Sequence, residues 1–116
     1  FRSRSMALVE QYNAFEPLPG EFINGKFTLG ENIGDLTGLT MGYAAYKKSL
    51  NGEEAPVIDG MTGDQRFFLS YGQIWQRKFR DEALRNRLKS DPHSPGEYRA
   101  NGIVRNFDKW YEAFNV

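Results

Sequence analysis

The chain has 116 residues, with fifteen basic and fifteen acidic side chains and no cysteine. A zero net charge argues against a dedicated nucleic-acid surface, which would be clearly basic, and the lack of cysteine excludes disulfides and thiolate metal sites. No apolar run reaches the roughly 18 residues that span a bilayer. The single histidine, His93, cannot alone supply the imidazoles that a hydrolytic metal site usually contains.

The apolar residues recur mostly at helical spacing, which predicts a mainly α chain with about four to five helices. The first helix is expected over 3–15, where apolar residues follow this spacing, and the Pro- and Gly-rich stretch 17–20 ends it. Residues 22–27 hold two short apolar stretches around Asn-Gly. This pattern favours a short β-hairpin, with a tight loop as the alternative.

A long helix is expected over about 29–50, because its apolar residues form one stripe. A loop over 51–62 follows, rich in Gly, Pro and acidic residues. Thr62 or Asp64 then caps a strongly amphipathic helix over about 64–78.

The rest of the chain predicts two shorter helices. A charged helix is expected over 80–90, and its basic residues suit a solvated face better than a nucleic-acid surface because acidic residues interrupt them. The stretch 91–104 holds two Pro and two Gly and is expected to be an ordered loop. A last short helix is expected over 106–114.

Two carboxylates and a line of glycines mark the long helix. Glu31 and Asp35 are four residues apart and so point to one side. Gly34, Gly38 and Gly42 each cost about 1 kcal/mol relative to Ala inside a helix, which indicates close approach of another backbone. The carboxylates suit a metal ligand and its supporting group, or alternatively an acidic first turn favoured by the helix dipole.

Three blocks of sequence carry a family resemblance. Gly-Glu-Asn-Ile-Gly-Asp-Leu-Thr-Gly-Leu at 30–39 resembles the Glu-Asn-Ile-x-Asp block of the neprilysin family of zinc metallopeptidases. Phe-Phe-Leu-Ser-Tyr-Gly-Gln-Ile-Trp at 67–75 and Asp-Pro-His-Ser-Pro-Gly-Glu-Tyr-Arg at 91–99 resemble two further blocks, in family order and separation. The resemblance covers roughly 20–114 and implies a segment of a zincin-like catalytic domain.

The resemblance assigns roles in the chemistry. It implies that Glu31 is the third zinc ligand and that Asp35 orients a zinc-bound histidine. It implies that His93 stabilises the tetrahedral intermediate by donating to the oxyanion, with Asp91 placed to orient the ring. Without this context, a lone histidine is more often a surface or packing residue.

The resemblance also assigns residues that contact substrate. Arg99 matches an arginine that grips the substrate backbone, with a surface salt bridge as the alternative. Trp75 and Ile74 match positions that line the pocket for the residue after the scissile bond. Core packing is the alternative for both.

The family's general base and its two zinc-binding histidines lie in a His-Glu-x-x-His helix, and this sequence has no such motif. The resemblance therefore implies that residues 1–116 are a C-terminal segment of the catalytic domain, truncated at both ends. Animal members carry cysteines near Gln76 and Val116, which favours a bacterial relative. Its compartment stays open between the periplasm or cell envelope and the cytoplasm.

Two hypotheses follow from the sequence. In the first, the parent protein is a zinc-dependent peptidase acting on short peptides, completed by the N-terminal part of its catalytic domain. In the second, the 116 residues act as a non-catalytic helical fragment or interaction module that self-associates through the Gly38 and Gly42 face. One carboxylate pair is too few ligands for the chain alone to hold zinc tightly.

Overall fold

The computed structural model of the chain describes residues 2–116 and confirms the mainly α prediction. Within this range there are six helices rather than four to five and no strand, only two isolated bridges, Leu18–Glu21 and Ile58–Met61. The helices are α1 (Arg2–Asn13), α2 (Gly25–Ser49), α3 (Gly63–Ile74), α4 (Asp81–Ser90), α5 (Gly96–Val104) and α6 (Asp108–Phe114). Across residues 2–116, none of these helices has both the length and the apolar character needed to cross a membrane.

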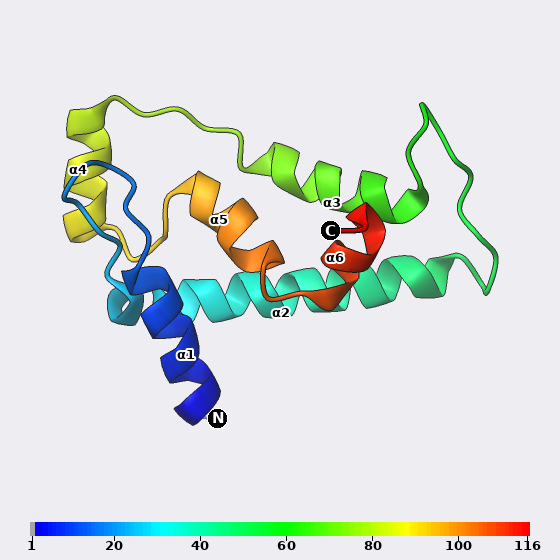
Figure 1. Cartoon of the computed structure of the whole chain (residues 1–116), viewed down its shortest axis with the longest axis horizontal. Coiled ribbons are helices and arrows are strands. Elements are labelled where there is room, and N and C mark those ends of the chain that lie inside the picture. Colours follow the sequence, from blue (N-terminus) through cyan, green and yellow to red (C-terminus); the bar gives the residue numbers. More distant parts are fainter. Residues whose placement is uncertain (1) are drawn as a thin grey trace.

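Helix α2 forms the long axis of a molecule that measures 46 × 34 × 23 Å (Figure 1). Helix α1 packs against the first half of α2, and α3 runs back along its second half. Helix α5 contacts both α2 and α3, and α6 packs on α3. Helix α4 lies at the same end of the molecule as the start of α2, so the segment that follows α4 passes close to Glu31's end of the helix.

The core is dominated by aromatic rings and by α5. Tyr12 and Ile103 are completely buried. Tyr43 stacks on Phe68 with ring centroids 5.8 Å apart, and Phe107 meets both rings edge-on. These contacts join α2 and α3 to the segment between α5 and α6.

The expected hairpin around Asn24-Gly25 is wrong, because Asn24 caps α2 instead. Its side chain accepts a hydrogen bond of 2.9 Å from the Phe27 amide, and its backbone is extended (φ −83°, ψ 95°). A two-residue Asn-Gly hairpin would need positive φ at Asn24. Gly25 donates to Asn13 Oδ1 at 2.7 Å and lies against the Val9 carbonyl, which leaves no room for a β-carbon. Helix α2 therefore begins four residues before the expected start.

Helix α3 begins as one of the two expected caps predicts. Thr62 Oγ1 accepts from the Gln65 amide, and the Gln65 side chain accepts from the Thr62 amide, which completes a capping box. The helix ends at Ile74, four residues before the expected end, and Trp75 caps it. The shorter helix frees 75–80 to cross toward α4.

The expectation of a loop over the whole of 91–104 is also wrong, because α5 occupies its second half. Pro95 sits at the N-cap, where its missing N–H is harmless. A β-carbon on Gly96 would lie 2.7 Å from the Trp75 carbonyl oxygen, and one on Gly102 would lie 2.7 Å from the Tyr12 hydroxyl. These glycines therefore allow close packing of a helix and do not mark a turn.

Candidate functional site

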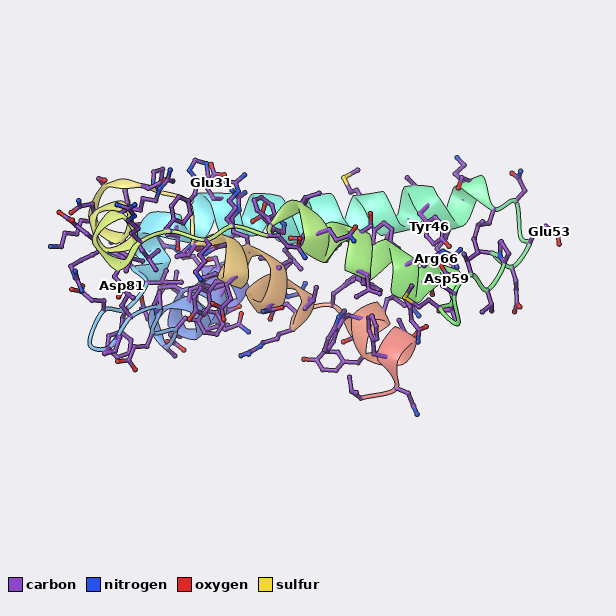
Figure 2. The ribbon with its side chains drawn as sticks, turned by 90° about the horizontal axis from the view of Figure 1, so that it is seen from above. Glu31, Tyr46, Glu53, Asp59, Arg66 and Asp81 are labelled. Carbon is purple, nitrogen blue, oxygen red and sulfur yellow. The ribbon has the colours of Figure 1, made fainter. Side chains whose placement is uncertain are left out.

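The structure brings together five of the six site residues expected from the sequence, and Ile74 is the exception. Glu31 and Asp35 lie one turn apart on α2, and His93 and Arg99 come from the segment before α5 and from α5 itself. Figure 2 shows Glu31 at the upper side of α2, far from Tyr46 and Glu53 at the opposite end. Packing of α5 on the first half of α2 thus joins residues 64 positions apart in sequence.

Arg99 and Asp35 form the most enclosed ion pair of the site. Arg99 Nε and Nη2 donate to Asp35 Oδ2 and Oδ1, each at 2.7 Å, and the side chains are 15% and 11% exposed. This two-point geometry suits a planar guanidinium. The hydrogen bonds to Asp35 raise the pKa of Arg99 above its already high value. The guanidinium carbon also lies 4.1 Å from the centre of the Trp75 ring, a cation–π contact that fixes the plane of the fork.

Two tyrosines hold the backbone that carries Arg99. The Tyr71 hydroxyl donates to the Arg99 carbonyl and the Tyr12 hydroxyl to the Tyr98 carbonyl, both at 2.8 Å. Burial, reinforced by the charge of Asp35, raises the pKa of Tyr71 to about 12, and burial likewise raises the pKa of Tyr12. Both hydroxyls therefore stay protonated as donors. No local pattern in the sequence indicates these contacts, because each joins residues on different helices.

His93 lies between two carboxylates. Its Nδ1 is 2.7 Å from Asp91 Oδ1, and its Nε2 is 3.2 Å from Glu31 Oε2. The His93 amide also donates to Asp91 Oδ1 at 3.0 Å, and this hydrogen bond is the main cause of the lowered pKa of Asp91. Asp91 fixes one edge of the ring, so the other edge faces Glu31. Glu31 Oε2 also lies 3.7 Å from Arg99 Nη2, which links the two ion pairs into one set.

A small cavity of about 180 Å³ opens beside this set, with Trp75, His93, Arg99 and Arg87 among its lining residues. Arg87 binds Asp91 at 2.7 Å and lies over the Phe79 ring, which closes the α4 side of the cavity. Ile74, expected beside Trp75 in a substrate pocket, is 62% exposed and does not line this cavity.

Glu31 is suited to contribute one ligand to a zinc ion. Its side chain is 43% exposed, and a carboxylate oxygen is a good donor for zinc. Within residues 2–116 there is no group of three or more His, Cys, Asp or Glu side chains that could hold a metal ion. The donor chemistry of Glu31 therefore fits a zinc site whose other ligands come from outside this chain.

The model of peptidase family M13 matches residues 1–116. The chain belongs to this family. Human neprilysin is 40% identical over 121 residues, an alignment that covers 99% of this M13 chain and 16% of neprilysin. Bovine endothelin-converting enzyme 1 is 37% identical over 118 residues and has the same coverage. The chain thus spans about a sixth of the length of the curated relatives it matches.

A solved structure of the zinc metalloprotease Zmp1 of Mycobacterium tuberculosis, in complex with an inhibitor, superposes on the M13 chain with a TM-score of 0.96. It is 52% identical and covers 99% of this chain and 18% of its own. The open state of Zmp1 gives a TM-score of 0.95. The six helices are therefore arranged as in a larger M13 protease, and the family resemblance of the three sequence blocks is confirmed.

Proposed function

We propose that this M13 chain is part of a zinc-dependent peptidase that hydrolyses peptide bonds in short peptides. The observation that carries the proposal is the connected set of Glu31, Asp35, His93 and Arg99, drawn from two segments far apart in sequence. The relatives support the reaction class, because Zmp1 is a zinc metalloprotease.

In this proposal, Glu31 supplies the third zinc ligand, and two imidazoles of a His-Glu-x-x-His helix outside the chain supply the others. Zinc, when bound, lowers the pKa of a water molecule and polarises the peptide carbonyl. Binding zinc requires Glu31 to give up part of its contact with His93. That contact is between exposed side chains and is weak, so it is readily exchanged.

His93 serves to stabilise the oxyanion that forms on the peptide carbonyl. An imidazole N–H aimed at the developing charge lowers the barrier. With both ring nitrogens protonated, Nδ1 donates to Asp91, and the Nε2–H, which contacts Glu31 in this structure, faces the substrate once Glu31 turns away to zinc. The same pair keeps the ring from turning, so no reorganisation is needed when the charge appears.

Asp35 orients a zinc-bound histidine, and Arg99 orients the substrate. Asp35 uses one lone pair on each oxygen for Arg99, so each oxygen keeps a second lone pair for the N–H of a zinc-bound histidine. Arg99 uses Nε and Nη2 for Asp35, which leaves Nη1 to donate to a substrate carbonyl. Trp75, stacked on Arg99, forms the wall for the substrate residue after the scissile bond, and Ile74, which lies outside the small cavity, would extend this wall only on its exposed side.

The test is Glu31→Gln in the longer protein that contains this chain, with Glu82→Gln on the exposed first turn of α4 as the matched control. We expect Glu31→Gln to abolish both bound zinc, measured by atomic emission, and chelator-sensitive cleavage of a fluorogenic peptide. The control should keep both. Full zinc content and full activity in Glu31→Gln would refute the role of Glu31.

A second candidate concerns the 116 residues alone, as a non-catalytic module that self-associates. The favouring observation is a partly bare face of α2: a β-carbon on Gly34 or Gly38 would meet no atom within 4 Å, and Met41 is 68% exposed. Gly42 is less open, because its β-carbon would lie 3.9 Å from the Phe67 ring. Light-scattering mass across a hundredfold range of concentration should then rise with concentration. A constant monomer mass counts against this candidate.

A further inference from the structure

A row of buried hydrogen bonds lies beneath the contact between Glu31 and His93. Asn32 is completely buried, and its Nδ2 donates to Thr28 Oγ1 at 3.0 Å. Its Oδ1 accepts from Ser94 Oγ at 2.8 Å, and Ser94 is itself buried. The row joins the interior of α2 to the segment that carries His93.

The direction of each hydrogen bond in this row is fixed by its neighbours. The Thr28 hydroxyl donates to the Asn24 carbonyl at 3.0 Å, so toward Asn32 it can only accept. Asn32 must therefore present its NH₂ group to Thr28 and its carbonyl oxygen to Ser94. A side-chain amide has both groups, whereas a carboxylate at this position would lack the donor.

The Glu31–His93 contact and the Asn32–Ser94 hydrogen bond join the same two segments in the same register. Glu31 and Asn32 are consecutive on α2, and they meet His93 and Ser94, which are consecutive in the segment before α5. The outer pair is about half exposed, with side-chain exposures of 43% and 45%, whereas both members of the inner pair are buried. An exposed ion pair is weak, but breaking the inner bond leaves a buried polar group without a partner, which is costly. The Asn32–Ser94 hydrogen bond therefore sets the distance between Glu31 and His93.

We propose that Asn32 and Ser94 are positioning residues that hold His93 beside Glu31. The role rests on the proposed peptidase function, in which His93 stabilises the oxyanion. Asn32 and Ser94 touch neither substrate nor metal, and they act through the ring of His93. Because Ser94 directly follows His93, a shift of the Ser94 backbone also displaces the imidazole ring and weakens oxyanion stabilisation.

The experiment is a double-mutant cycle in the longer protein, combining Ser94→Ala with His93→Gln. We expect Ser94→Ala to lower kcat about tenfold, since misplacement by about 1 Å can cost up to a hundredfold, with KM and bound zinc unchanged. In the His93→Gln background the same change should lower kcat less than about twofold, because the group through which it acts is already gone. Equal losses in the two backgrounds, or no loss in the first, overturn the proposal.

Two further variants guard against a loss of folding. Ser90→Ala removes another serine hydroxyl, which bonds only its own helix at 3.0 Å, and should leave kcat unchanged. Ser94→Cys keeps the size of the side chain with a weaker donor, and it replaces Ser94→Ala in the cycle if that variant does not fold. Its loss of kcat should again vanish in the His93→Gln background.

A separate measurement shows whether the proposed peptidase function itself is wrong. In that case the unsubstituted protein shows no zinc-dependent cleavage, and the positioning role is judged from the 116-residue chain. There the nuclear Overhauser contact between the His93 ring and the Glu31 side chain should weaken in Ser94→Ala and persist in Ser90→Ala. A contact of unchanged strength in Ser94→Ala overturns the positioning role.

Discussion

Arg99 and Asp35 join α5 to α2 through two parallel hydrogen bonds of 2.7 Å each. The pair lies under the Trp75 ring, and the Arg99 backbone is held by the Tyr71 hydroxyl. The same arginine thus connects three helical segments and approaches Glu31 at 3.7 Å. Its removal is expected to affect the stability of the fold as well as any substrate contact.

Arg99→Lys should lower the free energy of unfolding of the chain by about 2 kcal/mol, below the range of about 3–5 kcal/mol for fully buried pairs because this pair is partly exposed. A lysine keeps the charge but cannot make the two-point contact or lie flat on Trp75. Urea unfolding followed by circular dichroism measures the change. Arg85→Lys is the matched control, since the Arg85–Glu21 pair is single and more exposed, and it should change stability little. Equal effects of the two substitutions would contradict the assignment of Arg99 as a structural link.

The 116-residue chain alone should not bind zinc tightly. Glu31 is one ligand, and within residues 2–116 no group of three or more suitable side chains accompanies it. Structural zinc sites reach about 10–16 kcal/mol in apparent binding free energy, and calorimetric titration should show nothing comparable. The isotherm of Glu31→Gln should match that of the unsubstituted chain. Stoichiometric binding that Glu31→Gln removes would show that the chain completes a site by itself.

The chain should lose stability in alkaline solution between about pH 10 and pH 12. Burial raises the pKa of Tyr71 to about 12, and burial with the hydrogen bond to Asp64 raises that of Tyr43 to about 12, from an ordinary value of 10.0. The folded state therefore binds more protons than the unfolded state in this window. The stabilisation is complete below about pH 10 and is lost as the pH rises toward 12.

The measurement is the free energy of unfolding at a series of pH values, with tyrosinate absorbance recorded in parallel. Tyr71→Phe should make the alkaline decline shallower, because one of the shifted groups is gone. Tyrosinate absorbance that reaches completion near pH 10 while the chain is still folded would contradict the prediction.

Local chemistry predicts some helix boundaries and misleads at others. The Thr62 cap is foreseeable because threonine followed three residues later by glutamine is a capping-box pattern. Asn24-Gly25 carries two opposing signals, since asparagine suits both a hairpin and a helix cap, and contact of Gly25 with α1 decides between them. Helix α5 escapes prediction because its glycines are required by neighbours distant in sequence, such as Tyr12 against Gly102.

In the candidate site too, some features can be predicted from local sequence and others cannot. The four-residue spacing of Glu31 and Asp35 is enough to predict that both side chains lie on one side of α2. The contacts that define their partners could not be inferred from spacing, because they depend on how α5 docks. The Asn32–Ser94 hydrogen bond, for instance, joins residues 62 positions apart. The only local sign is an asparagine inside a helix, where it is unfavourable without a partner.

Gly38→Ala should stabilise the 116-residue chain but destabilise the longer protein. In the chain, a β-carbon at Gly38 meets no atom within 4 Å, so alanine should stabilise α2 by about 0.5–1 kcal/mol through helix propensity. Gly25→Ala is the contrasting control and should destabilise, because its β-carbon would overlap the Val9 carbonyl. In the longer protein, we expect another helix to pack on the glycine face of α2, and Gly38→Ala should then lower the melting temperature and the rate of peptide cleavage. Stabilisation in both settings would show that this face of α2 stays uncovered, and the cost of Gly38 in the helix would need another explanation.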